Sequence, residues 1–223
     1  MSIINVAIDG PAGAGKSTIS RAAAKELGFI YIDTGALYRT VGLNALRKGA
    51  DVNDRESVIA TLTDDLKVEL RFIDGEQRMF LNDEDVSDKI RTPEVSSAAS
   101  ITSAVPEVRK YLFDLQKNLA KNNNCIMDGR DIGTVVLPDA KVKIFLTASP
   151  EARAQRRYDE LIEKGMDVKY DDVIADMIKR DYDDSHRAIA PLKQADDAIL
   201  ADTSGNTLEE SIALIIKLIK DNI

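Results

Sequence analysis

The residues with the clearest chemical pattern lie near the start of the chain, where Gly10-Pro11-Ala12-Gly13-Ala14-Gly15-Lys16-Ser17 matches the phosphate-loop motif G-x-x-x-x-G-K-[ST]. Its glycines let the backbone turn sharply, so that successive N–H groups can point into one concavity. A polyphosphate fits there, with Lys16 on the β- and γ-phosphates and the Ser17 hydroxyl on Mg²⁺. The motif therefore predicts a site for a nucleoside triphosphate.

The segments on both sides of this motif agree with that interpretation. An apolar run over 3–8 has the composition of a buried parallel strand, and 17–27 has helical spacing that ends at Gly28. The alternative, a Gly- and Ala-rich turn with a chance lysine, does not require a strand before it and a helix after it. The order strand, loop, helix favours the phosphate site.

Further strand-like and helical segments predict the fold. Helical patterns over 36–48, 106–119 and 207–219 accompany apolar strand-like runs at 29–32, 125–127, 142–146 and 198–201. Alternating strands and helices are typical of an α/β fold, here a doubly wound five-stranded parallel sheet. Polar residues follow three strand ends, at Asp33, Asp128 and the phosphate loop, and open α/β sheets bind ligands at that edge. Asp33 or Asp128 could hold Mg²⁺ through water.

Residues 64–103 break this pattern. Leu66 to Phe72 alternates apolar and charged residues, and Asp74-Gly75 then turns the chain into a second short strand, as in an antiparallel hairpin. We expect this insertion, within a single domain spanning 1–223, to bind a second substrate. Arg109 lies off the apolar stripe of the following helix and is expected to be exposed or to face a cleft.

Three arginines are clustered beside a polar stretch in the last third of the chain. Ser149-Pro150 opens a helix that carries Arg153, Arg156 and Arg157, and a polar stretch separates it from a helix over 171–181. We expect a mobile lid over about 153–170 that excludes water from the transferred phosphate. Arg180, Asp184 and Arg187 are expected where the second helix gives way to loop, with His186 a bystander there. Phosphoryl transfer relies on such cations rather than on histidines, and the chain has one histidine.

Composition excludes several classes of protein. The chain has 223 residues and a formal net charge of −8, whereas proteins that bind nucleic-acid polymers carry a basic footprint. No apolar stretch resembles a signal peptide or a membrane span, and the single Cys125 cannot form an internal disulfide. We therefore expect a soluble cytoplasmic protein, with Cys125 in the core and Lys141 and Lys143 as solubilising charges.

Five sequence blocks together resemble a known family. They are IDGPAGAGKST at 8–18, DTGALYR at 33–39, IRTPEVSSAAS at 90–100, MDGRDIGTVVLPDA at 127–140 and RDYDDSHRAIAPL at 180–192. In this order they resemble the bacterial cytidylate kinases, the (d)CMP kinases of the nucleoside monophosphate kinase group. The resemblance spans the whole chain. It implies the reaction of ATP with CMP or dCMP to give ADP and CDP or dCDP, with Mg²⁺, in pyrimidine metabolism, by a monomer.

The resemblance also assigns roles to residues. It implies that the ATP phosphates contact Gly10, Pro11, Ala12, Gly13, Ala14, Gly15, Lys16, Ser17 and Thr18. It implies that Thr34, Arg39 and Arg130 contact the acceptor phosphate, that Ser100, Arg109 and Asp131 meet the cytosine, and that Arg180, Asp184 and Arg187 contact the sugar and phosphate region. The charged groups expected at the transferred phosphate are Lys16, Arg130, Arg153, Arg157 and Arg180.

A carboxylate facing the exocyclic amine of cytosine, and a guanidinium facing its acceptors, would discriminate against uracil.

Two other functions remain open from the residues. One is a kinase for another small acceptor, such as UMP, AMP or shikimate. The other is a regulatory switch that hydrolyses GTP slowly, although the sequence has no N-K-x-D guanine-recognition motif.

Overall fold

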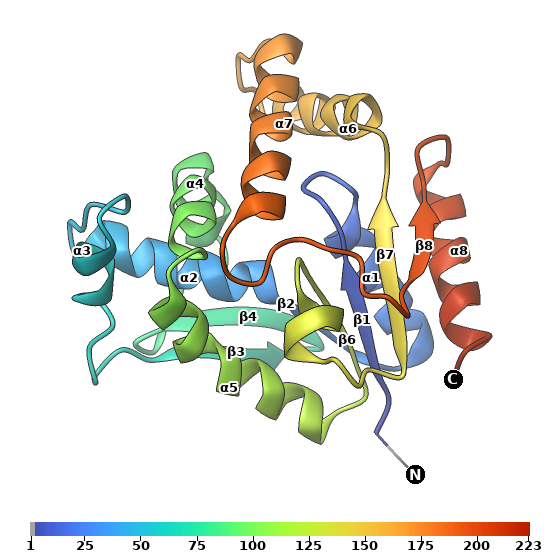
Figure 1. Ribbon diagram of the computed structural model, residues 1–223, viewed down its shortest axis with the longest axis horizontal. Helices are drawn as coiled ribbons and strands as arrows, with labels where there is room; N and C mark the ends of the chain where they lie inside the picture. Colours follow the sequence, from blue (N-terminus) through green and yellow to red (C-terminus); the bar gives the residue numbers. More distant parts are fainter. Residues whose placement is uncertain (1–2) are drawn as a thin grey trace. The chain divides into compact units, whose positions relative to one another are not determined.

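A five-stranded sheet forms the centre of one of the two units into which the chain divides in this computed structural model, which describes residues 3–223 (Figure 1). This nucleotide-loop unit comprises 3–31 and 120–223, and the second unit comprises 32–119. The strand order is β2-β6-β1-β7-β8, with bounds β1 Asn5–Asp9, β2 Ile30–Asp33, β6 Cys125–Gly129, β7 Val142–Thr147 and β8 Ile199–Asp202. The division into units passes through β2, so 32–33 are counted with the second unit. The predicted doubly wound α/β sheet is confirmed.

The central strand β1 is buried because it is apolar on both faces. Val6, Ala7 and Ile8 have no exposed surface, as expected for a strand covered on both sides. β1 pairs in parallel with β6, in a register that sets Asp9 beside Gly129, and with β7 on its other side. The polar residues that follow β1 and β6 therefore begin at the same edge of the sheet.

Four helices complete this unit: α1 Lys16–Leu27, α6 Pro150–Glu163, α7 Tyr170–His186 and α8 Leu208–Lys220. α1 ends as predicted at Gly28, which has φ +68° and donates its N–H to the carbonyls of Ala24 and Lys25. A capping box of Thr207 and Glu210 is present at the start of α8. Figure 1 shows α6 and α7 beyond the arrowhead end of β7.

The second unit has its own antiparallel sheet and its own core. β3 Val68–Ile73 and β4 Glu76–Leu81 form the predicted hairpin, in which Asp74 and Gly75 both have positive φ, and β5 Glu84–Asp85 adds a third strand. Its helices are α2 Thr34–Arg47, α3 Arg55–Ile59, α4 Pro93–Thr102, most of α5 Pro106–Asn122, and the 3₁₀ turn η1 Lys89–Arg91. The extents proposed for the insertion (64–103) and the lid (153–170) stay predictions.

Several local expectations were wrong. α7 continues to His186, so Arg180, Asp184 and His186 are helical rather than at a loop. Lys143 is buried and pairs with Asp197 instead of serving as a solubilising charge. For Arg109 the expectation of exposure is wrong, since the residue is only 9 % exposed, whereas a position facing a cleft stays a prediction.

Two short elements were not predicted from the sequence, although Asp54 is an N-cap signal for the second of them. Residues 132–136 form a π-helix, η2 Ile132–Val136, and 55–59 form α3. Within 3–223, no helix combines the length and apolar character that a membrane crossing requires.

Candidate active site

The phosphate loop joins β1 to α1 in the conformation that its glycines permit. Gly13 and Gly15 have φ of +72° and +81°, and a Cβ on Gly10 would lie 1.9 Å from the Leu146 carbonyl oxygen. Gly15 is the N-cap of α1, where no side chain caps the helix. The N–H groups of the first turn of α1 are therefore left for an anionic ligand.

The Lys16 side chain folds back over this loop. Its Nζ donates to the carbonyl oxygens of Gly10 and Pro11, each at 2.7 Å, and the residue is 7 % exposed. Burial, together with the nearby Arg130 guanidinium, lowers the pKa of Lys16, although the carboxylates of Asp128 and Asp184 act in the opposite direction. The ammonium thus lies where phosphate oxygens could replace the two carbonyls.

Ser17 and Asp128 form a pair of oxygen ligands beside the loop. The Ser17 hydroxyl donates to Asp128 at 3.1 Å, and the Tyr31 hydroxyl donates to the other oxygen of the same carboxylate at 3.2 Å. A hydroxyl and a carboxylate are donors that suit Mg²⁺, which completes its shell with water and substrate phosphates. These residues fit a magnesium ion. Asp33, the alternative ligand, belongs to the second unit.

After Asp128, the chain places two successive charges against the C-terminal half of α7. Arg130 donates to Asp184 at 2.8 Å, and Arg187 donates to Asp131 at 3.1 Å, and these side chains are between 6 % and 20 % exposed. Burial alone would raise the pKa of Asp184, but Arg130 holds it below its usual value. Four predicted acceptor-site residues therefore form two buried ion pairs.

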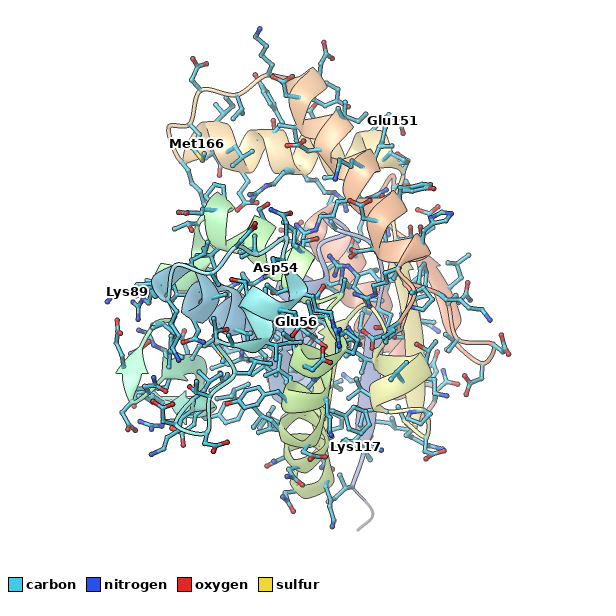
Figure 2. The ribbon with its side chains drawn as sticks, turned by 60° about the vertical axis from the view of Figure 1, so that its left-hand side comes forward. Asp54, Glu56, Lys89, Lys117, Glu151 and Met166 are labelled. Carbon is cyan, nitrogen blue, oxygen red and sulfur yellow. The ribbon has the colours of Figure 1, made fainter. Side chains whose placement is uncertain are left out.

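The lid arginines differ in their surroundings. Arg153 is 3 % exposed; its guanidinium donates to the carbonyls of Ala148 and Ala12, both at 2.9 Å, and pairs with Asp181 at 2.7 Å. Arg157 is half-buried and pairs with Glu160 on its own helix. Arg156 donates to the Thr203 carbonyl at 2.7 Å. In Figure 2, Glu151 and Met166 label the two ends of the region that contains these arginines.

Arg180 lies on α7, one turn before Asp184, and contributes to the low pKa of that carboxyl. It therefore belongs with the charged groups of the nucleotide-loop unit.

In the second unit, the carboxylate of Asp33 organises the predicted phosphate ligands. Asp33 caps α2 by accepting the Ala36 N–H at 2.8 Å, and it pairs with Arg39 at 2.8 Å and Arg91 at 3.3 Å. Although burial would raise the pKa of Asp33, these two guanidinium groups hold it below its usual value. Thr34 is the buried first residue of α2, next to this cluster.

The residues expected at the base also lie in the second unit. The Ser100 carbonyl accepts the Ser103 hydroxyl at 2.8 Å, and the Ser103 carbonyl accepts Arg109 at 3.3 Å. The Arg109 guanidinium lies 5.6 Å from the centre of the Tyr38 ring. Ser100 and Arg109 are therefore linked through Ser103.

Sequence reasoning missed Asp9 and Arg91 as members of these clusters. Asp9 accepts the backbone N–H groups of Ile132 and Gly133, and Arg91 shares the Asp33 carboxylate with Arg39. Asp9 could have been noticed because it is a charged residue that ends an apolar strand and directly precedes the phosphate loop. Arg91 lay inside a block that carried the resemblance, but its partner is far away in sequence.

A phosphate loop on a five-stranded parallel sheet, with a hydroxyl and a carboxylate beside its lysine, is typical of the P-loop class of nucleotide-binding proteins. A family model described as "Cytidylate kinase" matches residues 6–221. The chain belongs to the cytidylate kinase family.

Individual proteins agree with this assignment. The chain is 50% identical over 218 residues to a cytidylate kinase of Caldicellulosiruptor bescii, covering 98% of this chain and 96% of that protein. It is 48% identical over 225 residues to a cytidylate kinase of Leuconostoc mesenteroides subsp. mesenteroides, covering 100% and 99%. A crystal structure of an uncharacterized protein from Eubacterium ventriosum shares the fold, with a TM-score of 0.56, 15% identity and 99% of each chain covered.

Proposed function

We propose that the protein transfers the γ-phosphoryl group of ATP to CMP or dCMP, giving ADP and CDP or dCDP in pyrimidine nucleotide metabolism. The observation that carries this proposal is the segment 128–131, which sets Asp128 against Ser17 of the phosphate loop and places the Arg130 charge close enough to lower the pKa of Lys16. One short segment thus joins the predicted donor groups to two predicted acceptor groups. Family membership selects the cytidine nucleotide as the acceptor.

The donor is held by the loop 10–18. Its backbone N–H groups and the start of α1 bind phosphate oxygens, and Lys16 exchanges its two carbonyl contacts for the β- and γ-phosphates. Ser17 and Asp128 would hold Mg²⁺, directly or through water. When bound, this ion neutralises charge on the phosphates.

The acceptor phosphate is recognised by Thr34, Arg39 and Arg130, since arginine grips phosphate oxygens with two parallel hydrogen bonds. The carboxylate of Asp131 accepts from the exocyclic amine of cytosine, while Arg109 and Ser100 serve its other polar atoms. Uracil carries a carbonyl in place of that amine, so it would face the Asp131 carboxylate with an unpaired acceptor. Asp184, Arg180 and Arg187 bind the sugar and phosphate region.

Arginines stabilise the charge that spreads over the transferred group. We assign this role to Arg130, Arg157 and Arg180 together with Lys16, because phosphoryl transfer depends on positioning and charge neutralisation. We assign Arg153 to the same group, because its guanidinium donates to the Ala12 carbonyl of the phosphate loop. Closure of the lid segment excludes water and suppresses hydrolysis of ATP.

A coupled assay of ADP formation tests the reaction. Mg-ATP is supplied with CMP, dCMP, UMP, AMP, GMP or shikimate, one at a time, and with no acceptor as the control. We expect fast turnover with CMP and dCMP only. Fast turnover with another acceptor would overturn the cytosine assignment, and ATP or GTP hydrolysis without an acceptor would indicate the switch class instead.

We further propose that the protein acts as a monomer in the cytoplasm, where both nucleotides are available, and that it binds no nucleic-acid polymer. Burial raises the pKa of the Cys125 thiol to about 12 and keeps it unreactive, as expected for a core residue. Sedimentation equilibrium at several protein concentrations should give the mass of one chain, 24.5 kDa.

A further inference from the structure

Asp9 ends β1 and directly precedes the phosphate loop, but its carboxylate is bound to a distant part of the chain. It accepts the N–H of Ile132 at 2.8 Å and the N–H of Gly133 at 2.7 Å, across 123 and 124 residues of sequence. The residue is 5 % exposed. Both carboxylate oxygens are therefore used inside the protein.

These two N–H groups begin the π-helix η2. The first N–H groups of a helix have no partner within it, and a carboxylate satisfies them with charge-assisted hydrogen bonds at the positive end of the helix. π-helical turns are rare and recur at functional sites. Asp9 thus caps a rare helix from a neighbouring strand.

Gly133 gives an independent indication that this contact is tightly built. A Cβ on Gly133 would lie 3.3 Å from Cδ of Lys143 and 3.4 Å from the Asp9 carboxylate. The Lys143 stem is itself held in place, because its ammonium pairs with Asp197 at 2.7 Å. The start of η2 is therefore enclosed by Asp9 and by the Lys143 stem.

The residues just before η2 are Arg130 and Asp131, which pair with Asp184 and Arg187 of the α7 end. The peptide bond between Asp131 and Ile132 is planar, so a hydrogen bond to the Ile132 N–H also fixes the orientation of the Asp131 carbonyl group. Asp131 has φ −143° and ψ 27°, outside the regular helical and strand regions. Asp9 therefore holds the backbone that aims these two side chains.

We propose that Asp9 is a positioning residue for the acceptor nucleotide: it touches no substrate and fixes the backbone at 131–133 so that Arg130 and Asp131 keep their orientation. This role rests on the proposed function, in which these two residues contact the acceptor. Burying a charged carboxylate lowers the stability of the fold, and burial raises the pKa of Asp9 to about 6. A destabilising buried charge of this kind fits a role in positioning a site rather than in stabilising the fold.

The test is Asp9→Asn in the full chain. An amide offers one acceptor oxygen, so one of the two N–H groups would face the NH₂ group instead, and the 131–133 backbone would shift. We expect the KM for CMP to rise about tenfold or more and the preference for CMP over UMP to fall by a similar factor. The affinity for CMP, measured by titration calorimetry without ATP, should fall by a similar factor, while the KM for ATP changes less than about threefold.

A matched control is Asp54→Asn. Asp54 also accepts two N–H groups at a helix start, those of Glu56 and Ser57 at 3.3 and 3.2 Å, but at the short helix α3 of the second unit. Figure 2 labels Asp54 and Glu56 at this exposed helix. The control should leave both KM values and the CMP preference unchanged.

A second variant, Gly133→Ala, keeps the Asp9 charge but crowds its carboxylate. It should also raise the KM for CMP much more than the KM for ATP. This variant tests the proposal if Asp9→Asn does not fold. Unchanged CMP affinity and preference in a folded variant would overturn the proposal, as would equal losses for CMP and ATP. If the wild-type protein prefers another acceptor, the proposed function fails, and the same split measured with that acceptor still tests Asp9.

Discussion

Lys16 is the residue on which the donor site depends most directly. Its buried ammonium is held by two loop carbonyls, whose place the phosphate oxygens would take. We expect Lys16→Ala to lower kcat by at least about a hundredfold, because a preorganised charge on the transferred group is lost. The assay is ADP formation with saturating CMP.

Lys25→Ala provides the control for Lys16. Lys25 is an exposed lysine in the last turn of the same helix, away from the loop, so its loss should leave turnover unchanged. Near-normal turnover of Lys16→Ala would remove Lys16 from the proposed mechanism.

The raised pKa of Asp9 makes a prediction about stability and pH. The folded-state pKa of about 6 lies above the usual value of 3.8, so between these values the folded protein binds more protons than the unfolded chain. Above pH 6 the buried charge costs about 3 kcal/mol, and this cost disappears as the pH falls to 4. The charged groups that act on Asp9 are Asp131, which raises its pKa, and Lys16, which lowers it.

Urea unfolding of the wild type and Asp9→Asn from pH 4 to 7.5 measures this cost. The asparagine does not titrate, so the stability of the variant relative to the wild type should increase with pH by up to about 3 kcal/mol. Groups that titrate alike in both proteins cancel in the difference. A difference that stays constant over this range would mean that Asp9 is not the group that titrates near pH 6.

At the scale of elements, α6 carries three arginines, and the sequence could not distinguish the surroundings of the two expected at the transferred phosphate, Arg153 and Arg157. Arg153 is buried and holds both Ala12 and Asp181, whereas Arg157 is half-buried and pairs only within α6 among its described contacts. We expect Arg153→Ala to lower the free energy of unfolding by about 3 kcal/mol, because it leaves buried partners unpaired. Arg157→Ala should change it by less than about 1 kcal/mol.

The activity of Arg157→Ala provides a test that is separate from stability. Arg157→Ala should keep its fold and lose kcat by about a hundredfold or more, since a cation that stabilises the transferred phosphoryl group is removed. Thermal unfolding and kcat are measured on the same preparations, with Lys25→Ala beside them. Full kcat in Arg157→Ala would exclude this arginine from the transfer step.

The elements themselves were largely predictable because their signals are local. The spacing of the phosphate loop, the Thr92-Pro93 start of α4 and the Asp74-Gly75 hairpin turn all specify structure within a few residues. The η2 π-helix was not predictable, because its cap is the Asp9 carboxylate of another strand. α7 extended further than expected, since the predicted loop was inferred from polar residues that the helix accommodates.

The candidate site was predictable in its members but not in its pairing. The resemblance named Arg130, Asp131, Asp184 and Arg187, yet the ion pairs between them join residues 54 and 56 positions apart. Sequence spacing reports neighbours along one element, whereas these contacts depend on how α7 packs in the folded unit. Asp9 and Arg91 escaped notice for the same reason.

At the scale of the whole molecule, the two units have separate hydrophobic cores. Leu112 and Met79 belong to the core of the second unit, and Ile144 and Ile215 belong to that of the nucleotide-loop unit. Separate cores allow separate cooperative opening, in which hydrogen exchange in one unit does not require unfolding of the other. Each core can therefore be weakened by itself.

Leu112→Ala removes a side chain with no exposed surface and should cost about 2–5 kcal/mol in its own unit. We expect amide exchange to accelerate across 32–119, while β1, β6 and β7 keep their protection. Ile144→Ala, 1 % exposed in the other core, is the matched control and should give the reverse pattern. Hydrogen exchange with mass spectrometry measures both. If either variant accelerated exchange equally in both units, the molecule would unfold as one cooperative body. Separate opening of the two units would then be excluded.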